Sequence, residues 1–174
     1  ALFRSHGITR DSALMNEPSH GDWYYQQIAL GFNYRMTEIQ AALGLSQMSR
    51  LDQFVSDRHR LFRRYNEKLS GLPLVLPYQA PFSYSGLHLF VIRLNLCQIS
   101  RTQKQVFELL RERGVGTNIH YIPVHTQPYY QALGFQYGDF PEAESYYREA
   151  ISLPMFHGMS KDQQDIIINS LSEI

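Results

Sequence analysis

The feature that most limits the fold is a long helical pattern that runs from Thr37 to about Leu69. Apolar residues recur there at steps of three, four or five, and the opposite face is charged. The pattern begins with a T-x-x-Q capping box, in which Thr37 and Gln40 each bond the other's backbone N–H, which stabilises a helix start by about 1 kcal/mol. A single helix of about 30 residues is long for a globular protein. The pattern therefore predicts a helix that links two domains.

The composition is that of a folded globular chain. The 174 residues are 44% hydrophobic and 18% charged, which suits one compact domain or a domain with a fragment of another. The chain has 16 basic and 16 acidic residues, so its formal net charge is zero. This balance does not resemble the basic footprint of a nucleic-acid binder.

Cysteine content and hydropathy narrow the cellular context. Cys97 is the only cysteine, which excludes an internal disulfide and a cysteine metal cluster. No apolar run approaches the roughly 20 residues needed to span a bilayer. The N-terminal residues fit neither a signal peptide nor a transit peptide. We therefore expect a cytoplasmic protein that binds neither a membrane nor a nucleic acid.

The residues after the long helix predict alternating strands and helices. The stretch "LVLP" reads as a short strand, and Leu87–Leu96 is the clearest strand in the chain. A helix follows, capped by Ser100 with Gln103 in the capping-box position, and residues 116–122 return as a strand. Together these form a β-α-β unit, with a right-handed crossover if the strands are parallel neighbours.

Two further helices complete the expected α/β fold. One covers residues 139–153, with Pro141 near its first position, and the other begins at a third capping box formed by Ser160 and Gln163. We expect three parts, which are the end of a large domain over 1–36, a linking helix over 37–70 and a small α/β domain over 71–174. The opening "ALFRSHG" reads as the last turn of a helix, so we expect the chain to begin within a fold.

The triplet Asn33, Tyr34 and Arg35 stands directly before the capped helix start. A helix N-terminus carries unpaired N–H groups and partial positive charge, which suits an anion such as a phosphate. The alternative is that Gly31 and Asn33 only supply the left-handed backbone of a tight turn. On these residues alone, the turn is the simpler interpretation.

The densest chemistry lies in "GTNIHYIPVHTQPYY", where His120, Tyr121 and His125 follow a strand and enter a proline-marked loop. Asp139 is the only nearby carboxylate and the spacing fits no zinc motif, so we expect no metal site. The mixture suits a hydroxyl-rich ligand, although a strand edge packed by satisfied His and Tyr groups explains it equally well. The chain has no Gly-x-Ser-x-Gly elbow and no phosphate loop of Walker or Rossmann type.

Several stretches resemble one enzyme family in the family's own order. They are "RSHGI", "GFNYRMTEIQAALGLSQMSRLDQF", "GVGTNIHYIPVHTQPYY", "LGFQYGDFPEAESYYREAISLPMF" and "GMSKDQQDIII". They resemble the DegT/DnrJ/EryC1/StrS sugar aminotransferases, which use pyridoxal 5'-phosphate on the aspartate-aminotransferase fold (fold type I). The segments "HYIPVHTQPYY" and "GDFPEAE" look closest to the branch that makes UDP-4-amino-4,6-dideoxy-N-acetyl-β-L-altrosamine, a step toward pseudaminic acid.

The resemblance implies roles for the candidate residues. Asn33 would contact the cofactor phosphate bound in the partner subunit of a homodimer, with Tyr34 and Arg35 beside it. His120, Tyr121 and His125 would lie on the small domain's face of the cleft, close to the nucleotide-sugar. The parent enzyme would move an amino group from glutamate to C4 of a UDP-4-keto-6-deoxy-N-acetylhexosamine, through pyridoxamine phosphate in a ping-pong cycle.

The resemblance also implies that the catalytic lysine is not in this chain. In the family, the lysine that forms the Schiff base precedes the "RSHG" segment, whereas Lys68, Lys104 and Lys161 fall on predicted exposed helix positions. The chain therefore resembles the C-terminal part of the enzyme, and we expect it to be inactive alone. We also expect it to expose apolar surface and to associate.

Three alternatives stay open on the sequence. A sibling dehydratase of the same fold replaces the lysine with histidine, which only the upstream region would reveal. A non-catalytic module would bind a nucleotide-sugar or pair with a full-length subunit. A heteromeric enzyme could be completed by a separate polypeptide that carries the lysine.

Overall fold

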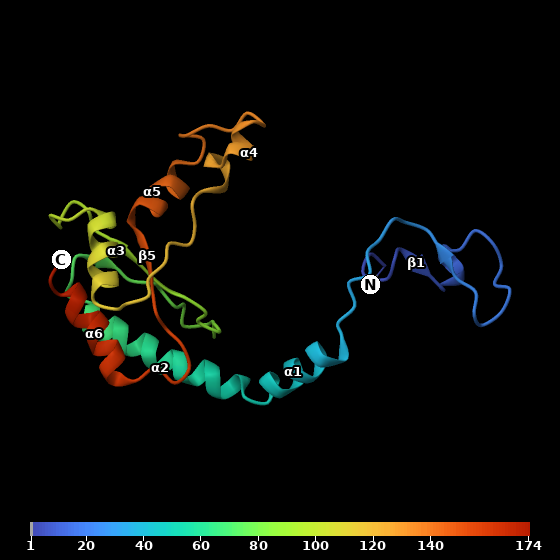
Figure 1. Ribbon diagram of the computed structural model, residues 1–174, viewed down its shortest axis with the longest axis horizontal. Coiled ribbons are helices and arrows are strands. Elements are labelled where there is room, and N and C mark those ends of the chain that lie inside the picture. The colour runs from blue at the N-terminus through green and yellow to red at the C-terminus, as the bar shows by residue number, and fades with distance from the viewer. Residues whose placement is uncertain (1) are drawn as a thin grey trace. The chain divides into compact units, whose positions relative to one another are not determined.

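The computed structural model describes residues 2–174 and falls into two compact units (Figure 1). The first unit ends at Arg50, and the second comprises Leu51–Ile174. Among residues 2–174, no helix is both long enough and apolar enough to cross a membrane.

Before helix α1 (Glu38–Met48), the first unit contains little regular structure. Strands β1 (Ile8–Thr9) and β2 (Gln26–Gln27) pair antiparallel, and the 3₁₀ helix η1 (Ser12–Leu14) lies between them in the chain. The segment before β1 is a hydrogen-bonded turn and not the helix end expected from the sequence. Gly7 is the one buried position among the described residues of this unit. Its φ is +71°, and a Cβ there would lie 1.8 Å from the Ala29 carbonyl oxygen, so only glycine fits.

The single linking helix expected over 37–70 is in fact two helices. They are α1 (Glu38–Met48) and α2 (Leu51–Leu69). The Ser49 hydroxyl donates to the Ser46 carbonyl at 2.9 Å, and such side-chain bonds to the backbone compete with helical hydrogen bonds. Helix α1 buries no residue, whereas α2 buries Leu61, Phe62, Tyr65 and Leu69. The expected capping box of Thr37 and Gln40 is confirmed.

The second unit is built on a three-stranded antiparallel sheet. Its strands are β3 (Leu74–Val75), β4 (Phe90–Leu94) and β5 (Ala150–Leu153), in the order β3-β4-β5. Strand β5 pairs with β4 through the register Phe90 with Leu153 and Arg93 with Ala150. The strand expected from "LVLP" is confirmed in its first two residues, and the strand expected over Leu87–Leu96 is confirmed in its central part.

The third strand is not where the sequence pattern placed it. Residues 116–122 contribute an isolated antiparallel bridge between Asn118 and Ser152, so the predicted strand and its parallel β-α-β unit are wrong. Helix α5 (Pro141–Glu149) ends at the start of β5, four residues earlier than expected. All four residues of β5 are buried, whereas buried and half-buried residues alternate along β4.

The remaining elements are α3 (Gln103–Glu112), η2 (Val124–Thr126), α4 (Pro128–Gln131) and α6 (Lys161–Leu171). Helix α3 is capped by Thr102 with Gln105, and not by Ser100 with Gln103 as expected. The Gln103 amide instead donates to two carbonyl oxygens at the end of α5, at 2.8 Å each. The capping box of Ser160 and Gln163 on α6 is confirmed.

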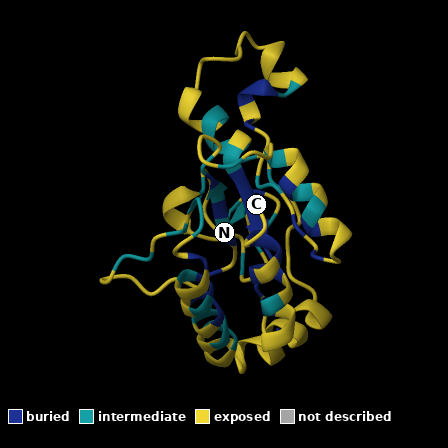
Figure 2. Ribbon diagram, turned by 90° about the vertical axis from the view of Figure 1, so that its left-hand side faces the viewer, coloured by how far each residue is buried: buried dark blue, intermediate teal, exposed yellow. Residues whose placement is uncertain are grey.

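The core lies between α2, α3, α6 and the sheet (Figure 2). Tyr65 is fully buried on α2, packs its ring 4.8 Å from that of Phe90, and donates its hydroxyl to the Pro154 carbonyl at 2.9 Å. Burial raises the pKa of Tyr65, so this hydroxyl stays protonated. These contacts tie α2 to β4 and to the residue that follows β5.

Candidate functional site

The first candidate group is the loop that carries Asn33, Tyr34 and Arg35. Its backbone is held by hydrogen bonds to the turn at the start of the chain. Tyr34 N–H donates to the Arg4 carbonyl at 3.0 Å, and Ser5 and Asn33 form an antiparallel bridge. The loop is therefore fixed in the first unit by main-chain bonds, which leaves its side chains free for other partners.

All three side chains of this loop are solvent-exposed. The Tyr34 ring is 71% exposed and stacks on Phe32, with centroids 4.9 Å apart and planes 6° from parallel. Within residues 2–174, the Asn33 amide and the Arg35 guanidinium have no hydrogen-bond or ion-pair partner. They are the donors of this loop that an anion could reach.

The helix start beside this loop is already occupied by its own cap. Thr37 N–H donates to the Gln40 side chain at 3.0 Å, and Gln40 N–H donates to the Thr37 hydroxyl at 3.3 Å. These bonds satisfy two of the groups that would otherwise bind an anion at the α1 N-terminus. Any phosphate contact here therefore depends on Asn33 and Arg35 more than on the helix end.

The second candidate group surrounds His120, at the edge of the sheet. His120 Nδ1 lies 2.7 Å from the Ser152 hydroxyl oxygen, and its Nε2 lies 3.4 Å from the Asn118 side-chain nitrogen. The Tyr121 ring meets the imidazole edge-to-face at 4.6 Å and is 72% exposed. His120 and Tyr121 thus form one partly open polar and aromatic surface.

His125 lies in a different environment, within η2. It is 7% exposed, and its Nε2 lies 2.8 Å from a Glu144 carboxylate oxygen that also accepts the Gly138 N–H at 2.6 Å. The hydrogen bond from His125, followed by that from Gly138, lowers the pKa of Glu144 below its ordinary value. Glu144 is therefore ionised at neutral pH and anchors the His125 ring.

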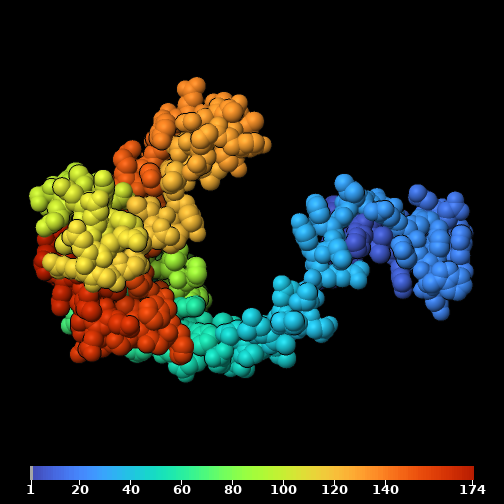
Figure 3. All heavy atoms as spheres, in the orientation of Figure 1, coloured from blue at the N-terminus to red at the C-terminus, as the bar shows by residue number. Residues whose placement is uncertain are grey.

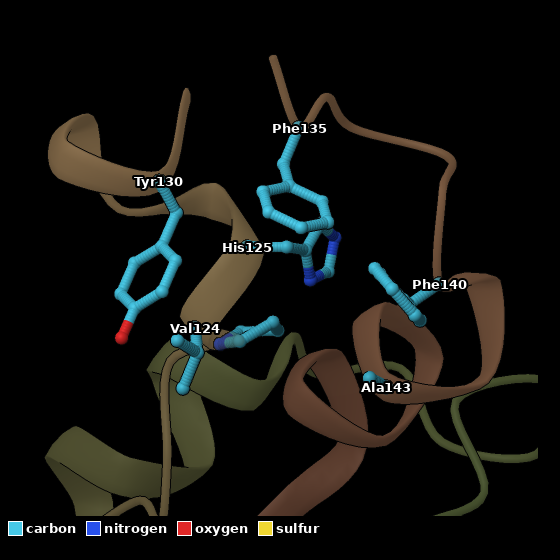
Figure 4. A pocket seen from close by; sticks show the side chains of 7 residues that line it. Val124, His125, Tyr130, Phe135, Phe140 and Ala143 are labelled. Atoms are coloured by element: carbon cyan, nitrogen blue, oxygen red, sulfur yellow. The ribbon is translucent and has the colours of Figure 1, made fainter. Parts of the chain in front are cut away.

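His125 forms one wall of an apolar pocket of about 310 Å³, shown in Figure 4. The other walls come from the following residues: Pro123, Val124, Tyr130, Phe135, Phe140 and Ala143. The Phe140 ring lies 4.9 Å from that of His125. The chain segment that builds the pocket, coloured orange in Figure 3, projects from the rest of the second unit.

The structure thus joins His120 with Tyr121 and assigns His125 to a separate pocket wall. The loop of Asn33 belongs to the other unit. Glu144 and Ser152 are contacts that sequence reasoning missed, because both lay inside a stretch interpreted as one helix. Their partners are 19 and 32 residues away in the chain, so no local pattern could reveal them.

The lysines lie on helix surfaces of the second unit. Lys68 and Lys104 form exposed ion pairs with Glu67 at 3.0 Å and Glu108 at 3.7 Å. Lys161 is the exposed first residue of α6. Across residues 2–174, no group of three His, Cys, Asp or Glu side chains could hold a metal ion.

Comparison with known proteins assigns the chain to a family. The family model described as DegT/DnrJ/EryC1/StrS aminotransferase matches residues 1–172. The chain belongs to this family. It is 34% identical, over 172 residues, to the spore coat polysaccharide biosynthesis protein SpsC of Bacillus subtilis, which covers 97% of this chain but 44% of that protein. The chain therefore spans less than half the length of the curated relatives it matches.

Solved structures of sugar aminotransferases share the fold. The pyridoxal-phosphate form of a putative sugar aminotransferase from Streptococcus pneumoniae has a TM-score of 0.83 at 24% identity, over 99% of this chain and 41% of that one. Helicobacter pylori PseC, an aminotransferase of pseudoaminic acid biosynthesis, has a TM-score of 0.82 at 26% identity, over 99% of this chain and 44% of that one. These likenesses confirm the predicted α/β aminotransferase fold.

Pyridoxal phosphate is the cofactor of this family, and the same Streptococcus protein is also known in a pyridoxamine-phosphate form. The residues of this chain fit one end of that molecule. The unpartnered Asn33 amide and Arg35 guanidinium suit a phosphate. The lysines do not suit its carbonyl end, because within residues 2–174 all three lie exposed on helices of the second unit.

Proposed function

We propose that this chain is the C-terminal part of a pyridoxal-phosphate-dependent nucleotide-sugar aminotransferase. The parent enzyme would move an amino group from glutamate to C4 of a UDP-4-keto-6-deoxy-N-acetylhexosamine, as in pseudaminic acid biosynthesis. The observation that carries the proposal is the family match over residues 1–172 together with the exposed, unpartnered Asn33 amide. The sugar-related names of SpsC and PseC support a sugar substrate.

The proposal gives each exposed side chain a role. Asn33 donates to the cofactor phosphate held by the partner subunit of a cytoplasmic homodimer, and Arg35 and Tyr34 line the same site. When bound, pyridoxal phosphate stores the amino group between the two half-reactions. His120 and Tyr121 contact the nucleotide-sugar, and His125 supports the wall of the neighbouring pocket.

The proposal also divides the chain by task. Residues 1–36 would complete the large cofactor-binding domain, the two helices within 37–70 would link the domains, and residues 71–174 would form the small domain. The Schiff-base lysine would come from the part of the parent enzyme that precedes this chain. The 174-residue chain alone would then be inactive.

The test compares the 174-residue chain with the longest open reading frame that contains it. Each is incubated with pyridoxal phosphate, glutamate and the UDP-4-keto sugar, and the amino sugar and 2-oxoglutarate are measured. We expect both products from the longer polypeptide and neither from the 174-residue chain. A longer polypeptide that carries histidine at the lysine position and dehydrates the sugar would overturn the proposal in favour of the sibling dehydratase.

Asn33 is tested in the longer polypeptide by Asn33→Asp, which replaces a donor with a negative charge. We expect pyridoxal phosphate to bind about 10- to 100-fold more weakly, the usual cost of losing a hydrogen bond to a charged group. Asn16→Asp, on another exposed loop of the same unit, is the charge-matched control. Equal cofactor affinity in the two variants would contradict the role of Asn33.

A further inference from the structure

Ser152 is a polar residue in a strand that is buried throughout. It is 5% exposed, stands between Ile151 and Leu153, and pairs with Val91 across the sheet. A buried hydroxyl without a partner destabilises a protein by about 1–3 kcal/mol, and alanine would avoid that cost. Within residues 2–174, the hydrogen-bond partner of the Ser152 hydroxyl is the His120 ring, at 2.7 Å.

The backbone around this contact fixes where His120 stands. Ser152 N–H donates to the Asn118 carbonyl at 2.8 Å, and Asn118 N–H donates to the Ser152 carbonyl at 3.4 Å. This bridge joins the two segments at Asn118 and Ser152. Asn118 stands two positions before His120. The position of the imidazole at the sheet edge is therefore set by the pairing with β5. It does not depend on the loop that follows His120.

The Asn118 side chain favours one of the two tautomers of the His120 ring. Its carbonyl oxygen accepts the Ile119 N–H at 2.8 Å, so its NH₂ group is the part that faces His120 Nε2, at 3.4 Å. Because an NH₂ group can only donate, this contact favours Nε2 as the acceptor and Nδ1 as the nitrogen that carries the proton. In that tautomer, Nδ1–H donates to the Ser152 hydroxyl oxygen.

We infer that Ser152 and Asn118 are positioning residues that hold His120 as the neutral Nδ1–H tautomer, with the Nε2 lone pair available to a donor. The Asn118 contact is long, so a ligand hydroxyl can take its place on Nε2. A sugar or ribose hydroxyl has this donor chemistry, whereas a phosphate oxygen does not. The ligand part of this inference rests on the proposed function, but the tautomer does not.

The tautomer is measured on the 174-residue chain by the ¹⁵N chemical shifts of the neutral His120 ring. We expect the wild-type chain to show a protonated Nδ1 and an unprotonated Nε2. In Ser152→Ala the population should shift toward Nε2–H, because Nδ1 loses its acceptor. Asn118→Ala changes an exposed residue and should move the tautomer population toward Nε2–H by a smaller amount.

Ser170→Ala is the matched control. Ser170 is 1% exposed and its hydroxyl donates to the Ile166 carbonyl within α6 at 2.7 Å. This variant removes another buried hydroxyl and should leave the His120 shifts unchanged. A wild-type Nε2–H tautomer, or shifts that neither Ser152→Ala nor Asn118→Ala alters, would overturn the inference.

Titration with UDP-N-acetylglucosamine separates this inference from the proposed function. If His120 contacts a sugar hydroxyl, Ser152→Ala should weaken binding about tenfold and Ser170→Ala should not. No binding by a wild-type chain that shows the Nδ1–H tautomer would count against the proposed ligand and leave the positioning intact.

Discussion

At the scale of single residues, Gln164 shows how one polar side chain ties two helices together. It is fully buried on α6, donates to the Leu61 carbonyl of α2 at 2.9 Å and accepts from the Arg64 guanidinium at 3.1 Å. We expect Gln164→Met, which keeps the volume and removes both bonds, to lower the free energy of unfolding by about 1–3 kcal/mol. Urea denaturation measures the change.

The control for this prediction is Gln131→Met on the exposed surface of α4. It makes the same chemical change away from the core and should alter the free energy of unfolding by less than about 0.5 kcal/mol. If the midpoint urea concentration of both variants equals that of wild type, the hydrogen bonds of Gln164 do not stabilise the packing of α2 on α6.

Glu144 gives the second prediction at this scale, and it concerns acid stability. Because the His125 and Gly138 hydrogen bonds lower the pKa of Glu144 in the folded chain, its stabilising contribution is present above its ordinary pKa of 4.5. That contribution is lost as the pH falls through the lowered folded-state pKa. Glu144→Gln should therefore be less stable than wild type near neutral pH, with a difference that shrinks between about pH 5 and pH 2.

The measurement is urea denaturation of both proteins across that pH range. Glu112→Gln removes an exposed carboxylate at the end of α3 and serves as the control. A difference between wild type and Glu144→Gln that stays constant with pH would show that the carboxylate does not anchor His125.

At the scale of elements, the start of α3 allows a test between two assignments of its N-cap residue. Sequence spacing favoured Ser100 with Gln103, but the structure caps α3 with Thr102, whose hydroxyl accepts the Gln105 N–H at 3.3 Å. We expect Thr102→Ala to lower the free energy of unfolding by about 1 kcal/mol. Ser100→Ala should change it by less than about 0.5 kcal/mol, because Ser100 lies outside the helix. Equal losses in urea denaturation would contradict the structural assignment.

The elements also show what the sequence could predict. Capping boxes are local, so the starts of α1 at Thr37 and of α6 at Ser160 could be predicted from a few residues each. Strand β5 could not, because "AISL" follows a helical pattern without a break and becomes a strand by pairing with β4. The same non-local pairing brings Ser152 to His120. The sequence therefore predicted His120 as a candidate but could not predict the residues that hold it.

At the scale of the whole molecule, the two units differ in how much surface they bury. The buried apolar core lies within residues 61–171. The first unit exposes large apolar side chains instead, among them Trp23 at 73%, Leu30 at 87% and Ile39 at 83%. Where exposed apolar side chains form a contiguous patch, they mark an interaction site in many proteins. That the chain associates, with a second copy or with the longer enzyme, stays a prediction.

Trp23 reports on that association, because it is the only tryptophan of the chain. In dilute solution we expect its fluorescence emission to be that of a water-exposed indole. As the chain concentration rises, the emission should move to shorter wavelength, in parallel with the mass measured by sedimentation equilibrium, since association buries the first unit. Trp23→Phe removes the signal and keeps an aromatic ring, so its mass distribution should match that of wild type. An increase in mass without a change in emission would place the contact elsewhere, and a monomer at every concentration would show that this exposed surface does not drive self-association.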